Sequence, residues 1–107
     1  MTIAESFDTM VTLFNAGAAG SMKKTFQWNI TGEEAGKYAL QIAEGKCELF
    51  PGGVEKADIT FTVADQDWLA IGEGKLDPMN AFATGKLKLA GDMMLAMKLQ
   101  QLFPIKR

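Results

Sequence analysis

The sequence predicts an α/β (α+β) protein in which helices cover one face of a single β-sheet. Two observations lead to this expectation. Several short segments alternate apolar and polar residues, as half-buried strands do, whereas segments at both ends of the chain repeat apolar residues at the spacing of amphipathic helices. Each predicted strand is apolar on one side only, which indicates a sheet with one face in water and helices on the other.

The composition is that of one small globular domain. The 107 residues are 48% hydrophobic and 22% charged, and a chain of this length forms one hydrophobic core but not two. We therefore expect a single domain over residues 1–107. No apolar run approaches a membrane span, and the N-terminus lacks the layout of a secretory signal. The single cysteine, Cys47, rules out an internal disulfide and favours a cytoplasmic location.

The first predicted element is a helix that begins at Thr2. Glu5 follows three residues later and completes a capping box, in which each side chain accepts a hydrogen bond from the other residue's backbone N–H. Apolar residues then recur at helical spacing from Ile3 to Phe14. We expect this helix to fade through residues 15–21, where two glycines weaken it.

Four strands are expected next. Apolar and polar side chains alternate along residues 25–30, 37–42, 46–49 and 58–63, with turn residues between them. The run from Phe50 to Gly53 is expected to end the third strand, because proline followed by two glycines cannot continue a hydrogen-bonded ladder.

Two short helices are expected after the fourth strand. Asp65 is interpreted as the N-cap of the first, with Asp67 in its first turn, and glycines at 72 and 74 end it. Asp77-Pro78 is a second start signal, because the capping residue precedes a proline at the first helical position. This second helix is expected to end at Gly85.

A fifth strand over residues 86–90 leads to a last helix, for which Asp92 is the expected N-cap. A helical wheel places two apolar groups on opposite sides of this helix. The leucine-rich side is enough to dock the helix on a core. The methionine-rich side then either fits ligands of varied shape or belongs to a helix buried nearly all round. The first side holds Leu95, Ala96, Leu99, Leu102 and Phe103, and the second holds Met93, Met94 and Met97.

The residue types that catalysis usually needs are missing or isolated. Because there is no histidine, the chain lacks the usual general base, the nucleophile pairs that use it and most zinc sites. Asp65 and Asp67 form an Asp-x-Asp pair, for which helix capping is the alternative to metal binding. Neither Gly74-Lys75 nor Gly85-Lys86 has the rest of a phosphate loop. We therefore expect no enzyme, no cofactor and no metal site.

Charge is unevenly distributed, although the net charge is only −2. Residues 85–107 carry five basic residues against the single Asp92, whereas the rest of the chain is acidic. No Lys/Arg cluster is interleaved with aromatic residues, which argues against a nucleic-acid partner. The basic end is suited to an anionic headgroup or a membrane surface. Alternatively, its lysines only solvate a strand and a helix.

Residues 57–103 resemble the sterol carrier protein 2 (SCP-2) family. The resemblance lies in the Ala64-Asp65 helix start, the link from Gly74 to Pro78, the pair Ala81-Phe82 and the closing segment from Gly85 to Met93. The strands from Thr25 onward follow the family's pattern as well. The short Gly/Ala-rich link at 16–21 and the lack of a peroxisomal tail resemble a stand-alone prokaryotic-type domain, for which a fatty acyl chain is a more natural cargo than a sterol.

The resemblance implies an SCP-2-like fold: an N-terminal helix, four strands, two helices, a strand and a C-terminal helix, with five strands in a mixed sheet. It also implies a hydrophobic tunnel between sheet and helices that binds fatty acids, fatty acyl-CoA, sterols or similar lipids without chemistry. Plain core packing is the alternative for each tunnel residue. The implied floor is Phe26, Trp28 and Phe61, the walls are Trp68, Ile71, Met79 and Phe82, and the roof is Met93, Met94, Met97 and Phe103.

Two further expectations concern partners. Lys86, Lys88 or Lys98 would contact an anionic lipid headgroup. Some bacterial proteins with this type of domain resemble accessory factors that present an isoprenoid quinone precursor, or another lipophilic substrate, to biosynthetic enzymes, and this role is the alternative function. Transient contact with a membrane surface fits either role. The oligomeric state stays open.

Overall fold

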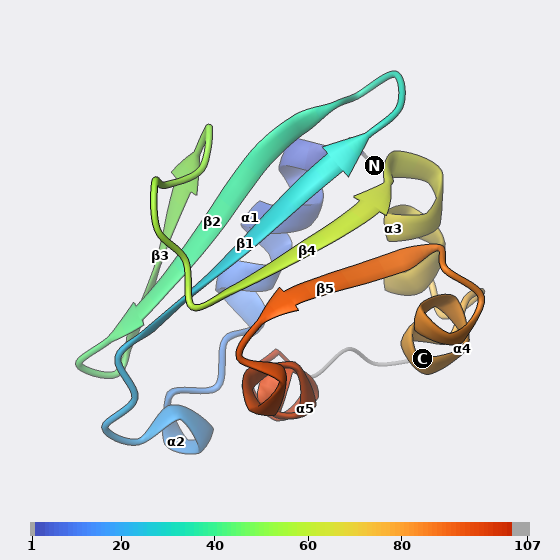
Figure 1. The fold of residues 1–107 in the computed structure, drawn as a ribbon. Coiled ribbons are helices and arrows are strands. Elements are labelled where there is room, and N and C mark those ends of the chain that lie inside the picture. The colour runs from blue at the N-terminus through green and yellow to red at the C-terminus, as the bar shows by residue number, and fades with distance from the viewer. Residues whose placement is uncertain (1, 104–107) are drawn as a thin grey trace.

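The computed structural model describes residues 2–103 as one layer of β-sheet with helices packed against it (Figure 1). This arrangement confirms the expected fold class. The elements, in chain order, are α1 (Ile3–Leu13), α2 (Ala16–Ala19), β1 (Lys24–Thr31), β2 (Gly36–Ala43), β3 (Lys46–Pro51), β4 (Ile59–Ala64), α3 (Asp65–Gly72), α4 (Pro78–Ala83), β5 (Leu87–Gly91) and α5 (Met93–Leu102).

The sheet is mixed, with the strand order β3-β2-β1-β4-β5. The central pair, β1 and β4, is parallel, and the other three pairs are antiparallel. Trp28 on β1 is in register with Tyr38 on one neighbouring strand and Phe61 on the other. Side chains directly opposite on neighbouring strands lie on the same face of a sheet. Three aromatic residues therefore form a row across the middle of the sheet.

The face of the sheet that carries this row is the buried one. Phe26 and Trp28 are 0% exposed and Ile30 is 3% exposed, as the alternation along β1 predicts. The α1 helix covers this face with its apolar side, which includes the fully buried Phe7, and Figure 1 shows α1 behind the strands. The hydrophobic core is thus a single layer between the sheet and its helices.

The opposite face of the sheet is only partly open to water, which differs from the expectation. The connection between β3 and β4 crosses it, as Figure 1 shows, and buries Gln27 and Ala39. The Gln27 Oε1 atom accepts a hydrogen bond from the Val54 backbone N–H at 2.7 Å. Gly53, with φ of 83°, lies so close that an added Cβ would be 2.7 Å from the same oxygen. Only glycine fits this crossing without strain.

The helix starts at Thr2 and Asp92 are as predicted. Thr2 Oγ1 accepts from the Glu5 N–H at 3.1 Å, and Glu5 Oε1 accepts from the Thr2 N–H at 2.8 Å. Asp92 Oδ1 accepts from the Met94 N–H at 3.0 Å and caps α5. The short helix α2 was not predicted. Asn15 caps it by accepting from the Ala18 N–H at 3.3 Å, a local signal that outweighs the glycines over one turn.

Asp65 has a different role from the predicted N-cap. The N-cap of α3 is Ala64, and Asp65 is the first helical residue, with a side chain that is almost fully buried. Its Oδ2 atom accepts from the Glu34 N–H at 3.0 Å and its Oδ1 atom from the Gln66 N–H at 2.7 Å. The carboxylate therefore joins the start of α3 to the turn between β1 and β2. Gly32 in that turn leaves it room, because a Cβ there would lie 2.5 Å from Oδ1.

Candidate functional site

Trp28 is the centre of an aromatic cluster between the sheet and the helices. Its ring stacks on Phe61 of β4 at a centroid distance of 5.0 Å, and Phe7 of α1 meets it edge-on at 5.3 Å. Trp68 of α3 packs against it at 5.7 Å and Phe26 at 6.3 Å. The structure therefore brings together four of the residues for which a lipid-lining role is predicted, from three different elements.

Phe7 and Tyr38 complete this cluster, although neither was among the predicted site residues. The Phe7 ring is stacked between Tyr38, at 4.5 Å, and Trp68, at 5.1 Å. The apolar stripe of the first helix was the signal for Phe7, but a stripe alone does not tell which core residues reach the centre. The register of β2 with β1, which places Tyr38 beside Trp28, is a tertiary property.

The two tryptophans of the cluster differ in how their N–H groups are satisfied. The Trp68 Nε1–H donates to Ser6 Oγ at 2.8 Å. The Trp28 Nε1–H is fully buried and has no hydrogen-bond partner within residues 2–103. An unpaired buried donor costs about 1–3 kcal/mol. The centre of the apolar layer therefore holds a donor that a ligand oxygen or a water molecule would satisfy.

The α5 helix lies on the core with one face only. Leu95 and Leu102 are 4% and 1% exposed, as the helical wheel predicts for the leucine side. Phe103, just after the helix, is buried and packs against Phe14 at 5.7 Å. Ile71 of α3 is buried in the same core. The alternative of a last helix buried nearly all round is excluded by this arrangement.

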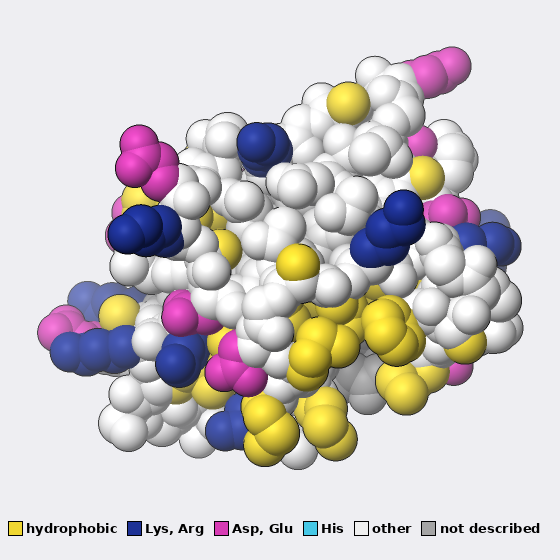
Figure 2. All heavy atoms as spheres, in the orientation of Figure 1, with side chains coloured by type: hydrophobic (Ala, Val, Ile, Leu, Met, Phe, Trp, Pro, Cys, Tyr) yellow, Lys and Arg dark blue, Asp and Glu magenta, His cyan; other side chains and the backbone are white. Residues whose placement is uncertain are grey.

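The remaining predicted site residues are exposed on the outer surfaces of α4 and α5. Met97 is 78% exposed and Met79 is 72% exposed. Figure 2 shows hydrophobic side chains gathered over these two helices, below β5. The predicted walls and roof are therefore divided between the core and the surface. The exposed set comprises Met79, Phe82, Met93, Met94 and Met97.

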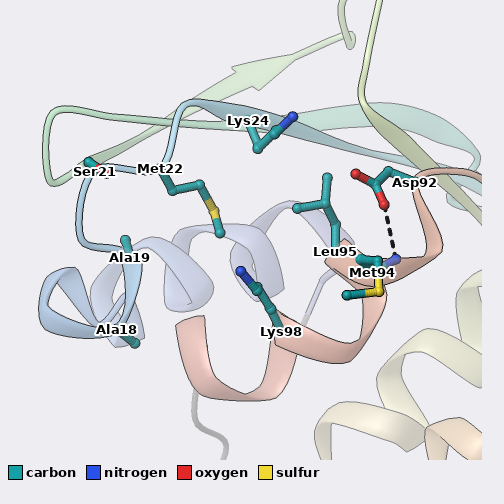
Figure 3. Close-up of a pocket in the computed structure, with 9 residues that line it drawn as sticks. All are labelled: Ala18, Ala19, Ser21, Met22, Lys24, Asp92, Met94, Leu95 and Lys98. Atoms are coloured by element: carbon teal, nitrogen blue, oxygen red, sulfur yellow. Dashed lines mark hydrogen bonds between the residues drawn. The ribbon is translucent and has the colours of Figure 1, made fainter.

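A surface pocket of about 340 Å³ lies between α2 and α5 (Figure 3). Its size is at the lower end of the range for small-molecule sites. Figure 3 shows Met22 and Lys98 pointing toward one another across it, with Lys24 on the strand above. The walls combine apolar surface with two lysines, a lining suited to the polar end of an amphiphile. The lining residues are Ala18, Ala19, Ser21, Met22, Lys24, Asp92, Met94, Leu95 and Lys98.

The titratable groups do not form a catalytic arrangement. Hydrogen bonds from backbone N–H groups, that of Glu34 first, lower the pKa of Asp65, and this carboxylate is occupied by those donors. Burial raises the pKa of the Cys47 thiol to about 11, which keeps it protonated and unreactive. Within residues 2–103 no three acidic or cysteine side chains are grouped to hold a metal ion. In the same range no helix is long and apolar enough to span a bilayer.

The fold is a mixed five-stranded sheet with an aromatic cluster on its buried face and a last helix that is apolar on two sides. The model of the SCP-2 sterol transfer family matches residues 12–104. The chain therefore belongs to the SCP-2 sterol transfer family, and this finding confirms the family expected from the sequence.

Individual relatives agree with this assignment. The chain is 49% identical over 71 residues to sterol carrier protein 2 of Rattus norvegicus, an alignment that covers 66% of this chain and 13% of the rat protein. It is 34% identical over 101 residues to hydroxysteroid dehydrogenase-like protein 2 of Xenopus tropicalis, covering 94% and 24%. The crystal structure of sterol carrier protein 2 like 2 from Aedes aegypti matches with a TM-score of 0.73 and 27% identity, over 94% of this chain and 92% of that one.

The relatives differ in how much of their length this domain represents. The chain spans 13% of the rat protein and 24% of the Xenopus protein, so both contain much sequence outside the match. By contrast, it spans 92% of the chain in the Aedes crystal structure. The family thus includes both stand-alone domains and domains within larger proteins, some of them named as enzymes, such as peroxisomal multifunctional enzyme type 2 of Mus musculus.

Proposed function

We propose that this protein binds a lipid non-covalently in the layer between sheet and helices and carries out no chemistry on it. The observation that carries the proposal is that α5 has large apolar side chains on two opposite faces. One face of this ten-residue helix is buried on the core, while Met94 and Met97 on the other are 66% and 78% exposed. A helix that only closes a core needs one apolar face. A second one is explained if α5 also contacts an apolar ligand.

Entry of a ligand beneath α5 would involve an outward movement of this helix, because Leu95 and Leu102 of α5 and the adjacent Phe103 are buried against the core. We infer that the helix moves as a unit. Its backbone hydrogen bonds are internal, and it is joined to the body by few others: Asp92 N–H donates to Asp58 O at 2.9 Å at its start, and Asn15 N–H donates to Leu102 O at 2.8 Å at its end. Such an arrangement is compatible with a shift of the whole helix about its ends, as in known hinge and shear movements.

The proposed lipid site joins the buried aromatic cluster to the inner surface that α5 uncovers. The aromatic residues of β1 and β4 form the floor, and α3 contributes one wall. The flexible methionines are exposed on the outer side of α4 and α5, so they would reach the ligand only if α5 also rotates as it moves outward. The residues proposed to line the lipid are Phe26, Trp28, Phe61, Trp68, Ile71, Met79, Phe82, Met93, Met94, Met97 and Phe103.

The pocket between α2 and α5 is proposed to receive the polar end of the lipid. Lys24 and Lys98 line it from opposite elements. Within the described part of the chain, the one ion pair joins Lys75 and Glu73 at 3.4 Å, so both pocket lysines are available. Hydrogen bonds from lysine to a carboxylate or phosphate are charge-assisted and stronger than neutral ones. This lining favours a fatty acid or an acyl-CoA over an uncharged sterol.

The energetics allow moderate affinity. Each buried CH₂ contributes about 0.8 kcal/mol, so a chain of about sixteen carbons gains roughly 12 kcal/mol. Association and ordering cost about 4–15 kcal/mol. Micromolar dissociation constants are therefore expected, and picomolar ones are not. The SCP2L2 protein of Aedes aegypti, whose likeness to this chain is one of fold, has been solved in a palmitated form.

Presentation of an isoprenoid quinone precursor to biosynthetic enzymes, the alternative function, is not favoured by the comparisons. We also infer that the isolated domain is not an enzyme, with support from the absence of histidine and from the occupied Asp65 carboxylate. The protonated thiol of Cys47 is compatible with a cytoplasmic location.

Native mass spectrometry of the purified protein tests the proposal. We expect a co-purified lipid, or after delipidation a one-to-one complex with added palmitate that competes with a fluorescent fatty acid. Lys24→Gln and Lys98→Gln should weaken the binding of palmitate more than the binding of its uncharged alcohol. Substitution of the exposed Lys46 on β3, Lys46→Gln, should change neither affinity. A delipidated protein that binds neither palmitate nor a sterol at micromolar concentration would refute the proposal.

A further inference from the structure

The exposed hydrophobic side chains of this protein are concentrated in one place. Five large hydrophobic side chains are more than a third exposed within residues 2–103, and all five belong to α4 or α5. The α4 helix packs on β5 and the α5 helix packs on β4, and these two strands form one edge of the sheet. Figure 2 shows the resulting patch. We call it the methionine face, and it consists of Met79, Phe82, Met93, Met94 and Met97. Contiguous exposed apolar patches mark interaction surfaces, whereas single exposed residues do not.

The chemistry of the surrounding segment indicates the kind of partner. Residues 85–103 contain three lysines and one aspartate, while residues 2–84 contain six lysines and twelve acidic residues. Lys86, Lys88 and Lys98 are exposed, and the one acidic side chain, Asp92, is bound to the Met94 N–H. Met93, Met94 and Met97 of the methionine face therefore lie within a net-positive stretch, and Met79 and Phe82 lie on the helix just before it. Apolar side chains beside lysines match the interface of an anionic bilayer.

A second copy of the chain fits this surface less well. A stable dimer interface involves roughly 20–30 residues on each side, and the methionine face offers five. In a symmetric dimer the same patch meets itself, so the lysines of both copies would be brought together. Methionine is also too flexible to specify a single docking geometry, but this flexibility does not matter against a fluid bilayer.

We propose that the methionine face docks the protein on anionic membranes and that docking opens the lipid site. The inference rests on the proposed function, because the helix that carries Met93, Met94 and Met97 also covers the proposed lipid layer. Insertion of these side chains among acyl chains would hold α5 away from the sheet. The site would then open toward the membrane, and a lipid would pass between them without crossing water.

Vesicle flotation tests the proposal with the delipidated protein. The probes are vesicles of phosphatidylcholine alone and vesicles with about a third phosphatidylglycerol, a content chosen to give a clearly negative surface. We expect binding to the anionic vesicles that weakens with salt. Met94→Gln/Met97→Gln should lower the partition coefficient roughly tenfold or more, because two large apolar contacts with the bilayer are lost. Lys86→Gln/Lys88→Gln should reduce the preference for anionic vesicles.

Matched control variants distinguish vesicle binding by the methionine face from non-specific adsorption. Leu13→Gln removes a partly exposed apolar side chain on α1, and Lys46→Gln removes an exposed lysine on β3, at the opposite edge of the sheet from β5. Both should bind vesicles like the unchanged protein, and circular dichroism should show that every variant is folded. Equal losses in Leu13→Gln and in the methionine variant would overturn the proposal.

Two further outcomes also overturn it, in ways that leave the proposed function distinguishable. If the unchanged protein binds a free fluorescent fatty acid in vesicle-free buffer but does not bind anionic vesicles, the docking proposal fails and lipid binding stands. If sedimentation instead finds a dimer that Met94→Gln/Met97→Gln dissociates, the methionine face binds a second copy of the chain. Loss of fatty acid binding by the unchanged protein would refute the proposed function itself.

Discussion

Substitutions on the two faces of α5 are expected to lower the free energy of unfolding by very different amounts, and a matched pair of substitutions compares them. Leu102 is 1% exposed and Met97 is 78% exposed on the same helix. Removing a buried leucine side chain costs about 2–5 kcal/mol, because apolar contacts are lost and a cavity is left. A change at an exposed position away from specific contacts costs about 0.5 kcal/mol or less. Leu102→Ala is therefore expected to be at least four times as destabilising as Met97→Ala.

Urea unfolding of the delipidated protein measures this difference. The chain has two tryptophans: Trp28 lies in the core and the partly buried Trp68 packs against it, so both report global unfolding by fluorescence. With about 4 °C or more per kcal/mol for a domain of this size, Leu102→Ala should also lower the melting temperature by roughly 8 °C or more. Equal costs for the two substitutions would refute the assignment of faces on α5 and, with it, the interpretation of the methionine face.

Four other changes test separate parts of the structure. Met97→Lys should weaken lipid binding while leaving the protein folded, and an unchanged affinity would remove Met97 from the proposed site. Asp65→Asn should lower the free energy of unfolding at pH 7. Because the native pKa of Asp65 is lowered, the carboxylate contributes fully to stability above the ordinary carboxyl pKa of about 3.9, and this contribution is lost as the pH falls through the native pKa. In acid, the stability of the variant should therefore vary less with pH than that of the unchanged protein. Trp28→Phe should destabilise by less than about 1 kcal/mol, because loss of the unpaired N–H offsets lost packing, and a cost of about 3 kcal/mol or more in urea unfolding, as expected for Trp28→Ala, would argue against an unpaired donor. Gly53→Ala should cost about 1–3 kcal/mol from strain and crowding, and clearly more than Gly45→Ala, where φ is also positive at 73° but no atom lies within 4 Å of the added Cβ.

The local signals in the sequence predicted most of the elements, because alternation and capping depend on neighbouring residues. The Thr2 capping box and the Asp92 N-cap are formed by side chains that lie within three residues of their partners. Alternation along β1 likewise predicted that Phe26, Trp28 and Ile30 are buried. These features do not need knowledge of the rest of the fold.

The features that were missed depend on segments far apart in the chain. Asp65 looked like an N-cap, yet its carboxylate binds the Glu34 N–H, 31 residues away. Gln27 looked like a solvent-facing strand residue, yet the connection that contains Val54 covers it, 27 residues away. No periodicity encodes such contacts, because they arise only when strands are placed side by side.

The candidate site was predictable only in part, because its composition follows from local patterns but its assembly depends on how distant segments pack. The aromatic residues of β1 and β4 come together because their strands are neighbours in register. The wheel separated the leucine and methionine sides of α5 correctly. The wheel could not tell whether the methionine side faces solvent or another part of the protein, so the exposure of Met97 to solvent was not predicted.

The central claim is that a lipid lies against Trp28 beneath α5, and fluorescence quenching tests it most directly. In a Trp68→Phe variant, Trp28 is the only tryptophan left. A stearic acid that carries a nitroxide in mid-chain should quench its emission with a midpoint in the micromolar range, and unlabelled palmitate should reverse the effect. If the labelled fatty acid binds, as native mass spectrometry would reveal, but leaves the Trp28 emission unchanged, the lipid lies elsewhere and the claim is contradicted.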